Sequence, residues 1–413
     1  MIGIADPASA GFDPERLARI CVWMNAFVNE KKLAGSSILV ARGGNIVLEH
    51  ATGLRDRDRK EPFQRDTVAR IYSMTKPITT TALMILSERG FFHLDAPISE
   101  FLPEFSECRA LVPGAVTIDQ TEPCPTPSLH QLATHTSGLS YSFNPGVLPA
   151  SMVVEDLHFG PNQGLLGDHV NHLASLPLAF HPGTRWEYSV GIDVLGRVIE
   201  VVSGRSLNDF LREEILDPLG MLETGFSVTS GATCRFSALY TPLAGNAFDL
   251  NSAEIGDESL RLIDRPEASP FLRASLHSGG GGLVGTIDDY LKFVEMLRRG
   301  GALGDQRLLA RNTVRFMTAN HLPCEIASMG PKSFAEQPME GMGFGLGGAV
   351  VLNPGRARCV GSIGDFSWGG MASTFFWMDP HEDLSVVFFT QLSPSSSYPI
   401  RPQLKALVHA ALN

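Results

Sequence analysis

Two side chains three residues apart, Ser73 and Lys76, have the types and spacing that covalent catalysis needs. They form the S-x-x-K segment Ser73-Met74-Thr75-Lys76, which opens an apolar helical stretch running to Arg89. Residues i and i+3 of a helix lie on one face, so the lysine amine can reach the serine hydroxyl. A lysine with a lowered pKa can take the hydroxyl proton and activate the serine. The motif therefore predicts a nucleophilic serine, although the same spacing is expected about once by chance in a chain of this length.

The place of Ser73 at the beginning of its helix strengthens this prediction. A helix N-terminus carries partial positive charge and free N–H groups, which stabilise a developing oxyanion. Pro77 falls in the first turn, where its missing N–H costs nothing. The position of Ser73 and the S-x-x-K motif therefore both favour a nucleophilic serine.

A tyrosine could complete the proton transfer. Tyr188 stands between a turn-like segment, residues 181–184, and a predicted helix, where it could share a proton with Ser73 and Lys76. It could equally be an interfacial tyrosine that packs its ring. Tyr141 is a rival for the same role, so the local sequence leaves the choice open.

A glycine pair in the segment Trp368-Gly369-Gly370-Met371 forms a third element, which enters a strand predicted over residues 371–378. Two glycines at a strand start let another group approach the backbone closely. This suits an oxyanion donor or a substrate lying along the strand edge. A β-bulge without function is the alternative.

The helices and strands that must position these residues come from both ends of the chain and are separated by a long middle segment. Helical spacing predicts a first helix, and a glycine run at residues 279–282 precedes a helix capped by Thr286. The middle, from about residue 103 to 182, is rich in loops. The predicted helices cover residues 14–32, 73–89, 190–203, 207–216, 287–299 and a last one from about Pro402, and the predicted strands cover residues 37–41, 45–50, 344–351, 371–378 and 384–389.

These motifs, together with further landmarks, make the chain resemble the class C β-lactamase superfamily and, within it, the family VIII carboxylesterases. The order and spacing of the landmarks are far more specific than S-x-x-K alone. Besides Ser73–Lys76 they are Leu94-Asp95-Ala96-Pro97-Ile98, Phe101-Leu102-Pro103-Glu104-Phe105, Leu132-Ala133-Thr134-His135-Thr136-Ser137-Gly138-Leu139, Pro182-Gly183-Thr184-Arg185-Trp186-Glu187-Tyr188-Ser189, Pro218-Leu219-Gly220-Met221, Thr224-Gly225-Phe226, the glycine run with Thr286, and Gly343-Phe344-Gly345-Leu346-Gly347.

The resemblance implies both a site and a fold. Ser73 would be the nucleophile, Lys76 and Tyr188 the general acid–base pair, and the N–H groups of Ser73 and Met371 the oxyanion hole. The fold would be α+β, with an antiparallel sheet flanked by helices and a mainly helical inserted domain. Residues 1–100 and 275–413 would form the first domain and residues 101–274 the second, with the site between them.

Two departures from the β-lactamase pattern bear on the substrate. The superfamily's Tyr-x-Asn is replaced by Tyr188-Ser189-Val190, and Val190 offers no side-chain hydrogen bond. In place of Lys-Thr-Gly or His-Thr-Gly, the late strand carries Trp368, Gly369 and Gly370, which we expect to contact the substrate. An indole in place of a cation favours a neutral ester over an anionic lactam. His277-Ser278-Gly279 matches the third motif literally, but it precedes the glycine run and is set aside.

The expected function is hydrolysis of small, short-acyl carboxylic esters through an acyl-enzyme on Ser73. A β-lactamase, a D-amino-acid peptidase or an acyltransferase on the same scaffold is the alternative, and weak cephalosporin hydrolysis is expected. A non-enzymatic alternative is an acylated sensor or a structural homologue, but Ser73, Lys76 and Tyr188 are all intact.

Composition and missing motifs exclude other classes of function. The net charge of −11, without a Lys/Arg run, disfavours nucleic acid. The N-terminal residues 1–7 lack the regions of a signal peptide, and no apolar run approaches the ~18 residues of a membrane span. We therefore expect a cytoplasmic protein with no membrane partner and an undetermined oligomeric state.

Metals and cofactors are not expected either. The chain has no G-x-S-x-G, no H-E-x-x-H around His169 and His172, and no phosphate- or dinucleotide-binding glycine fingerprint. Its six cysteines are scattered and suggest buried thiols.

Overall fold

Strands from two distant parts of the chain form one sheet in the computed structural model, which describes residues 2–245, 254–256, 260–335 and 337–413. The nine strands lie in the order β1-β3-β2-β21-β20-β19-β18-β17, with β4 paired to β3. β1 runs parallel to β3, and the other pairs are antiparallel. The strands are β1 (Gly3–Ile4), β2 (Gly35–Arg42), β3 (Asn45–Asp56), β4 (Glu61–Pro62), β17 (Met342–Phe344), β18 (Ala349–Val351), β19 (Phe366–Gly369), β20 (Phe375–Asp379) and β21 (Leu384–Thr390).

Both faces of the sheet are apolar because helices cover each of them. Alternate residues of a strand point to opposite faces, and β21 divides accordingly: Val386 and Phe388 pack with α1 and α13, whereas Val387 and Phe389 pack on the side of α9. This explains why the late strands read as unbroken apolar runs rather than as alternating patterns.

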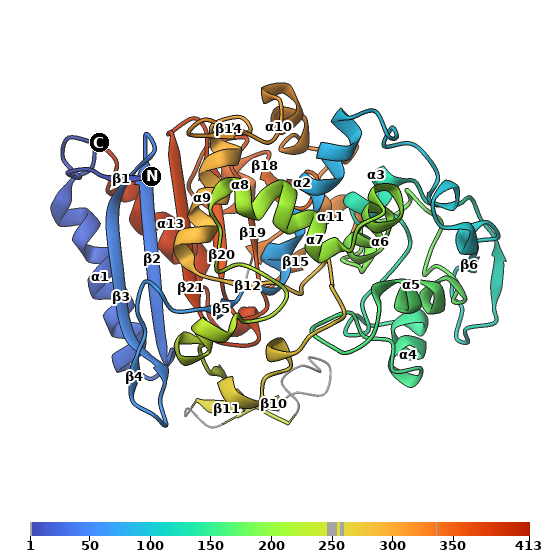
Figure 1. Cartoon of the computed structure of the whole chain (residues 1–413), viewed down its shortest axis with the longest axis horizontal. Coiled ribbons are helices and arrows are strands. Elements are labelled where there is room, and N and C mark those ends of the chain that lie inside the picture. Colours follow the sequence, from blue (N-terminus) through green and yellow to red (C-terminus); the bar gives the residue numbers. More distant parts are fainter. Residues whose placement is uncertain (1, 246–253, 257–259, 336) are drawn as a thin grey trace.

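The helices fall into those that cover the sheet and those that build the rest of the molecule (Figure 1). α2 lies between the two parts, and its residues 75–86 are all buried. The helices are α1 (Pro14–Asn29), α2 (Thr75–Glu88), α3 (Leu129–Ala133), α4 (Val147–Val154), α5 (Leu166–Ala174), α6 (Gly191–Ser203), α7 (Leu207–Leu211), α8 (Asp217–Leu219), α9 (Ile287–Arg298), α10 (Arg311–Met317), α11 (Ile326–Met329), α12 (Pro354–Ala357) and α13 (Ile400–Ala410).

Short strand pairs complete the fold. The pair β5–β12 joins the segment before Ser73 to the segment after the glycine run, with Arg70 opposite Val284. The pairs are β5 (Ala69–Arg70) with β12 (Val284–Gly285), β6 (Arg109–Leu111) with β7 (Thr121–Pro123), β8 (Leu239–Thr241) with β11 (Arg261–Asp264), β9 (Leu243–Ala244) with β10 (Glu254–Ile255), β13 (Ala302–Leu303) with β14 (Gln306–Arg307), and β15 (Ser333–Phe334) with β16 (Gln337–Pro338).

Two strands predicted near the C-terminal end have different bounds in the structure. The single strand predicted over residues 344–351 is wrong: residues 342–351 form a hairpin of β17 and β18, because the chain turns between them and Gly347 adopts a φ of 86°. The strand predicted over residues 371–378 begins only at Phe375. Before it lies a turn in which the Gly370 N–H donates to the Thr374 carbonyl at 2.7 Å. Trp368 and Gly369 therefore end β19 instead of starting β20.

The predicted helix over residues 207–216 is also interrupted, since α7 ends at Leu211 and a π-helical turn, Arg212–Leu216, follows. The two chain ends lie close together (Figure 1), with the Asn413 N–H donating to the Gly11 carbonyl. None of the helices in the described part of the chain combines the length and apolar character that a membrane span requires.

Candidate active site

Ser73 lies in a strained turn that leads into α2. The 3-10 turn Tyr72–Met74 precedes the helix, and Tyr72 adopts a φ of 41°, which is unfavourable for a residue with a bulky side chain. The Tyr72 ring is buried against Phe271 with centroids 5.6 Å apart, and the Tyr290 hydroxyl donates to the Met74 carbonyl at 2.9 Å. These contacts hold the turn, while Ser73 itself stays partly exposed.

The hydroxyl oxygen of Ser73 accepts two hydrogen bonds. The Tyr188 hydroxyl donates to Ser73 Oγ at 2.6 Å, and Lys76 Nζ donates to it at 3.2 Å. The structure thus brings together the three residues that the sequence proposed for proton transfer. Tyr188 rather than Tyr141 contacts the serine.

Lys76 is completely buried and has three hydrogen-bond acceptors. Besides Ser73 Oγ, Nζ contacts the Tyr141 hydroxyl at 2.9 Å and the Gly280 carbonyl at 2.6 Å. Burial lowers the pKa of Lys76 to about 7, and the nearby Asp193 carboxylate opposes part of that fall. A substantial fraction of the amine is therefore neutral at neutral pH and able to accept a proton.

Tyr188 sits in an aromatic cage that suits a proton donor. Its ring lies 4.8 Å from the centroids of His135 and Phe334 and 5.6 Å from that of Trp368. Burial raises the pKa of Tyr188. The phenol therefore keeps its proton at neutral pH, which leaves Lys76 as the candidate base beside Ser73.

The two pKa directions predict the pH dependence of the reaction. Since only the neutral amine can take the Ser73 proton, kcat/KM should rise through about pH 7 and level off above it. Stopped-flow or plate-reader kinetics with a nitrophenyl ester over a buffered pH series would measure this limb. A limb near the ordinary lysine value, about pH 10, would contradict the assignment.

The segment Trp368–Met371 lies directly against the chain that leads into the Tyr72–Met74 turn. A Cβ at position 370 would collide with the carbonyl oxygen of Ile71, so glycine is needed for the approach. Gly369 likewise leaves room for the guanidinium of Arg401, which would lie 2.6 Å from a Cβ there. Met371 therefore follows β19 in a turn beside Ser73. That its backbone N–H helps to form an oxyanion hole stays a prediction.

Trp368 is an almost fully buried ring beside Tyr188. It is 4% exposed, and its ring stacks on Phe334 with centroids 5.7 Å apart and planes 12° apart. Phe334 belongs to the short strand β15, which the sequence reasoning did not include. Aromatic walls of this kind favour uncharged, apolar groups.

The structure adds residues that the sequence reasoning missed or set aside. Tyr141 contacts Lys76, and behind it lies Asp193 in the first turn of α6. Ser278 belongs to His277-Ser278-Gly279, which the sequence analysis sets aside as a third motif, and Gly280 belongs to the glycine run that follows it. The unbroken glycine run was the signal that could have revealed it, because such a run permits close backbone approach.

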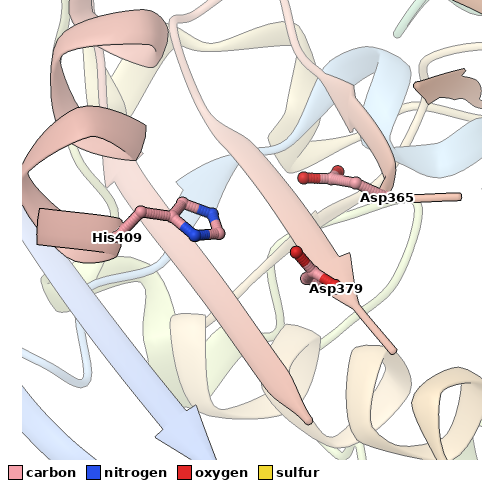
Figure 2. Close-up of side chains that lie close together, drawn as sticks. All are labelled: Asp365, Asp379 and His409. Atoms are coloured by element: carbon pink, nitrogen blue, oxygen red, sulfur yellow. The ribbon is translucent and has the colours of Figure 1, made fainter. Parts of the chain in front are cut away.

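One group of side chains away from Ser73 has the spacing of a metal site in the described residues. Asp365, Asp379 and His409 offer ligand atoms that all lie within 4.8 Å of one another, and Figure 2 shows them converging. Lys405 Nζ donates to Asp365 Oδ2 at 2.6 Å, and the backbone N–H groups of residues 362, 381 and 382 donate to Asp379. The cluster thus already holds an ammonium group of the chain itself, and we assign it no part in the chemistry at Ser73.

Comparison with known proteins shows the family to which the chain belongs. Residues 23–410 match the protein family described as Beta-lactamase. Esterase EstB from Burkholderia gladioli is 31% identical over 414 residues, which cover 98% of each chain. Lovastatin esterase from Penicillium rubens is 29% identical over 378 residues, which cover 87% of this chain and 89% of that one.

A solved structure extends the comparison. EstCE1, described as a hydrolase with promiscuous acyltransferase activity, has a TM-score of 0.76 and 28% identity, and the match covers 96% of this chain and 99% of that chain. These matches confirm the predicted α+β fold class and support serine-hydrolase chemistry. The chain belongs to the β-lactamase family and shares its fold with esterases of that family.

Proposed function

We propose that the chain hydrolyses small, short-acyl carboxylic esters through an acyl-enzyme on Ser73. The observation that carries the proposal is the double hydrogen bond on Ser73 Oγ, from Lys76 at 3.2 Å and from Tyr188 at 2.6 Å. One partner has a lowered pKa and the other a raised pKa, so a base and an acid meet at the same oxygen.

The reaction then runs in two halves. Ser73 Oγ attacks the ester carbonyl while Lys76 takes its proton, and the backbone N–H groups of Ser73 and Met371 hold the oxyanion. Lys76 and Tyr188 pass the proton to the alkoxide as its bond to the acyl carbon breaks, so the alcohol leaves. Water attacks the acyl carbon in the second half, and its proton returns to Ser73 Oγ as the acid departs.

The surroundings of the serine favour an ester over a lactam. By the resemblance, Trp368 stands where β-lactamases carry a cationic strand residue, and its ring stacks on Phe334, so an anionic substrate gains little there. Val190 replaces the amide of Tyr-x-Asn, and Lys76 contacts Tyr141 and Gly280 instead. We propose a small, neutral ester as the substrate and no cofactor.

An acyltransferase is the second candidate, because the same acyl-enzyme can pass its acyl group to an alcohol instead of water. EstCE1, a hydrolase with promiscuous acyltransferase activity, combines both activities on this fold. A β-lactamase or a D-amino-acid peptidase remains a further alternative on this scaffold.

A panel of nitrophenyl esters from acetate to octanoate, with nitrocefin alongside, tests the proposal. We expect the highest kcat/KM for short acyl chains and only weak nitrocefin turnover. A nitrocefin rate comparable to the ester rates would favour a β-lactamase instead. Intact-mass spectrometry after an ester pulse should show a transient acyl adduct, whereas a persistent adduct would indicate a sensor.

A further inference from the structure

A buried carboxylate lies behind Lys76 and has no role in the mechanism above. Asp193 is 0% exposed and belongs to α6. Its Oδ1 accepts from the Ser278 hydroxyl at 2.5 Å and from the Gly280 N–H at 2.9 Å, and its Oδ2 accepts from the Tyr141 hydroxyl at 3.2 Å. A charge buried this deeply is costly unless it is hydrogen-bonded, and Asp193 has these three donors.

The contacts of Lys76 determine where its lone pair can point. A neutral amine has two N–H donors and one lone pair. The Gly280 carbonyl, at 2.6 Å, can only accept, so it takes one N–H. If the Tyr141 oxygen accepts the other N–H, at 2.9 Å, the lone pair faces the remaining neighbour, the Ser73 hydroxyl.

The Tyr141 oxygen can accept an N–H from Lys76 only if its own hydroxyl proton points away from Lys76. A tyrosine hydroxyl can donate or accept, and a hydroxyl hydrogen rotates to suit its partners. The ionised carboxylate of Asp193 can only accept, so it draws the Tyr141 proton to itself. The Tyr141 oxygen is then left to accept from Lys76.

We propose that Asp193 is a positioning residue: by taking the Tyr141 proton, it orients the lone pair of neutral Lys76 toward Ser73. The inference rests on the proposed function, since it assigns the direction of the hydrogen bonds that make Lys76 the base. It also accounts for Gly280, whose N–H reaches Asp193 while its carbonyl reaches Lys76. A Cβ at position 280 would collide with Asp193 and lie 2.6 Å from the Tyr141 oxygen, so glycine is required.

Asp193 also influences the protonation of Lys76 through its charge, among several groups that face the lysine. Burial lowers the Lys76 pKa, and Asp193 raises it. Burial and the lysine charge keep the pKa of His135 well below its usual value, so that ring is neutral. The titratable groups around Lys76 and Tyr188 are Tyr141, Tyr188, Asp193, His135 and, acting on Tyr188, Arg401.

Asp193→Asn tests the proposal because it keeps the shape and reverses one hydrogen bond. The asparagine oxygen must stay opposite the fixed Gly280 N–H, so the amide nitrogen faces Tyr141 and donates to it. The Tyr141 proton then turns toward Lys76 and occupies its lone pair. We expect kcat, measured at about pH 9 where Lys76 is neutral in both proteins, to fall on the order of 100-fold.

Two further readouts separate positioning from a merely structural role. The acid limb of kcat/KM should move to lower pH in Asp193→Asn, because the charge that raises the Lys76 pKa is gone. Tyr141→Phe should lower kcat on its own. In the double variant, the fall in kcat should equal that of Tyr141→Phe alone. The two losses should not multiply, because the Tyr141 hydroxyl proton that would occupy the Lys76 lone pair is absent.

Asp365→Asn is the matched control, because it neutralises another fully buried aspartate, paired with Lys405, outside the site. It should lower the melting temperature without moving the acid limb. An Asp193→Asn protein with wild-type kcat at about pH 9, or losses that multiply in the double variant, would overturn the inference. If Ser73→Ala retained turnover, the proposed function would fail instead, so the two failures can be told apart.

Discussion

Ser73→Ala should abolish ester turnover while the protein stays folded. The substitution removes the oxygen that both Lys76 and Tyr188 contact, so no acyl-enzyme can form. We expect kcat/KM to fall on the order of 10⁶-fold, the scale reached when a serine hydrolase loses its nucleophile. Nitrophenyl-ester kinetics, thermal melting and intact-mass spectrometry after an ester pulse would measure activity, folding and adduct together.

The control is Ser36→Ala, which removes a buried hydroxyl from β2. It should leave both turnover and the adduct unchanged. If the Ser73→Ala protein kept more than about one-hundredth of the wild-type rate, or still formed the adduct, another residue would be the nucleophile.

Lys76→Met should lower kcat/KM by about 10²–10⁴-fold, the usual contribution of a general base. Methionine fills the buried volume of the lysine stem but offers no amine to take the Ser73 proton. Tyr188 cannot replace it, because burial raises the pKa of that phenol and keeps it protonated. Kinetics at about pH 8 would measure the fall in kcat/KM, because wild-type Lys76 is mostly in its neutral, proton-accepting form there.

Lys405→Met is the matched control for this variant, since Lys405 is only 2% exposed and its ion pair with Asp365 lies outside the site. It should lower the free energy of unfolding without changing kcat. A Lys76→Met protein within tenfold of wild type would contradict the proposed base and point to Tyr188 in that role.

Local sequence was sufficient to predict a contact wherever the residues involved lie within one short helical segment. S-x-x-K places Ser73 and Lys76 on one helical face at any helix N-terminus, and the structure puts their functional atoms 3.2 Å apart. Thr286 likewise caps α9, with its side chain accepting from the Asp289 N–H. Turns between apolar runs were harder to locate. Residues 344–351 and 371–378 read as continuous strands because both faces of the sheet are buried, so no change of pattern marks where pairing stops.

By itself, the sequence predicted Ser73 as the nucleophile and Lys76 as its neighbouring base. Through the order of its landmarks, it also indicated the family and the fold class, which the comparisons confirm. Tertiary structure alone decided which tyrosine contacts Ser73 and which contacts Lys76, because Tyr188 and Tyr141 come from loops whose approach is set by packing. It also placed the glycine run beside Lys76. Gly280 and Asp193 are far apart in the chain, and no local spacing shows that the backbone of one residue, Gly280, links a buried carboxylate to a buried amine. Contacts between distant segments depend on how helices and loops pack, and this is the information that a motif does not contain.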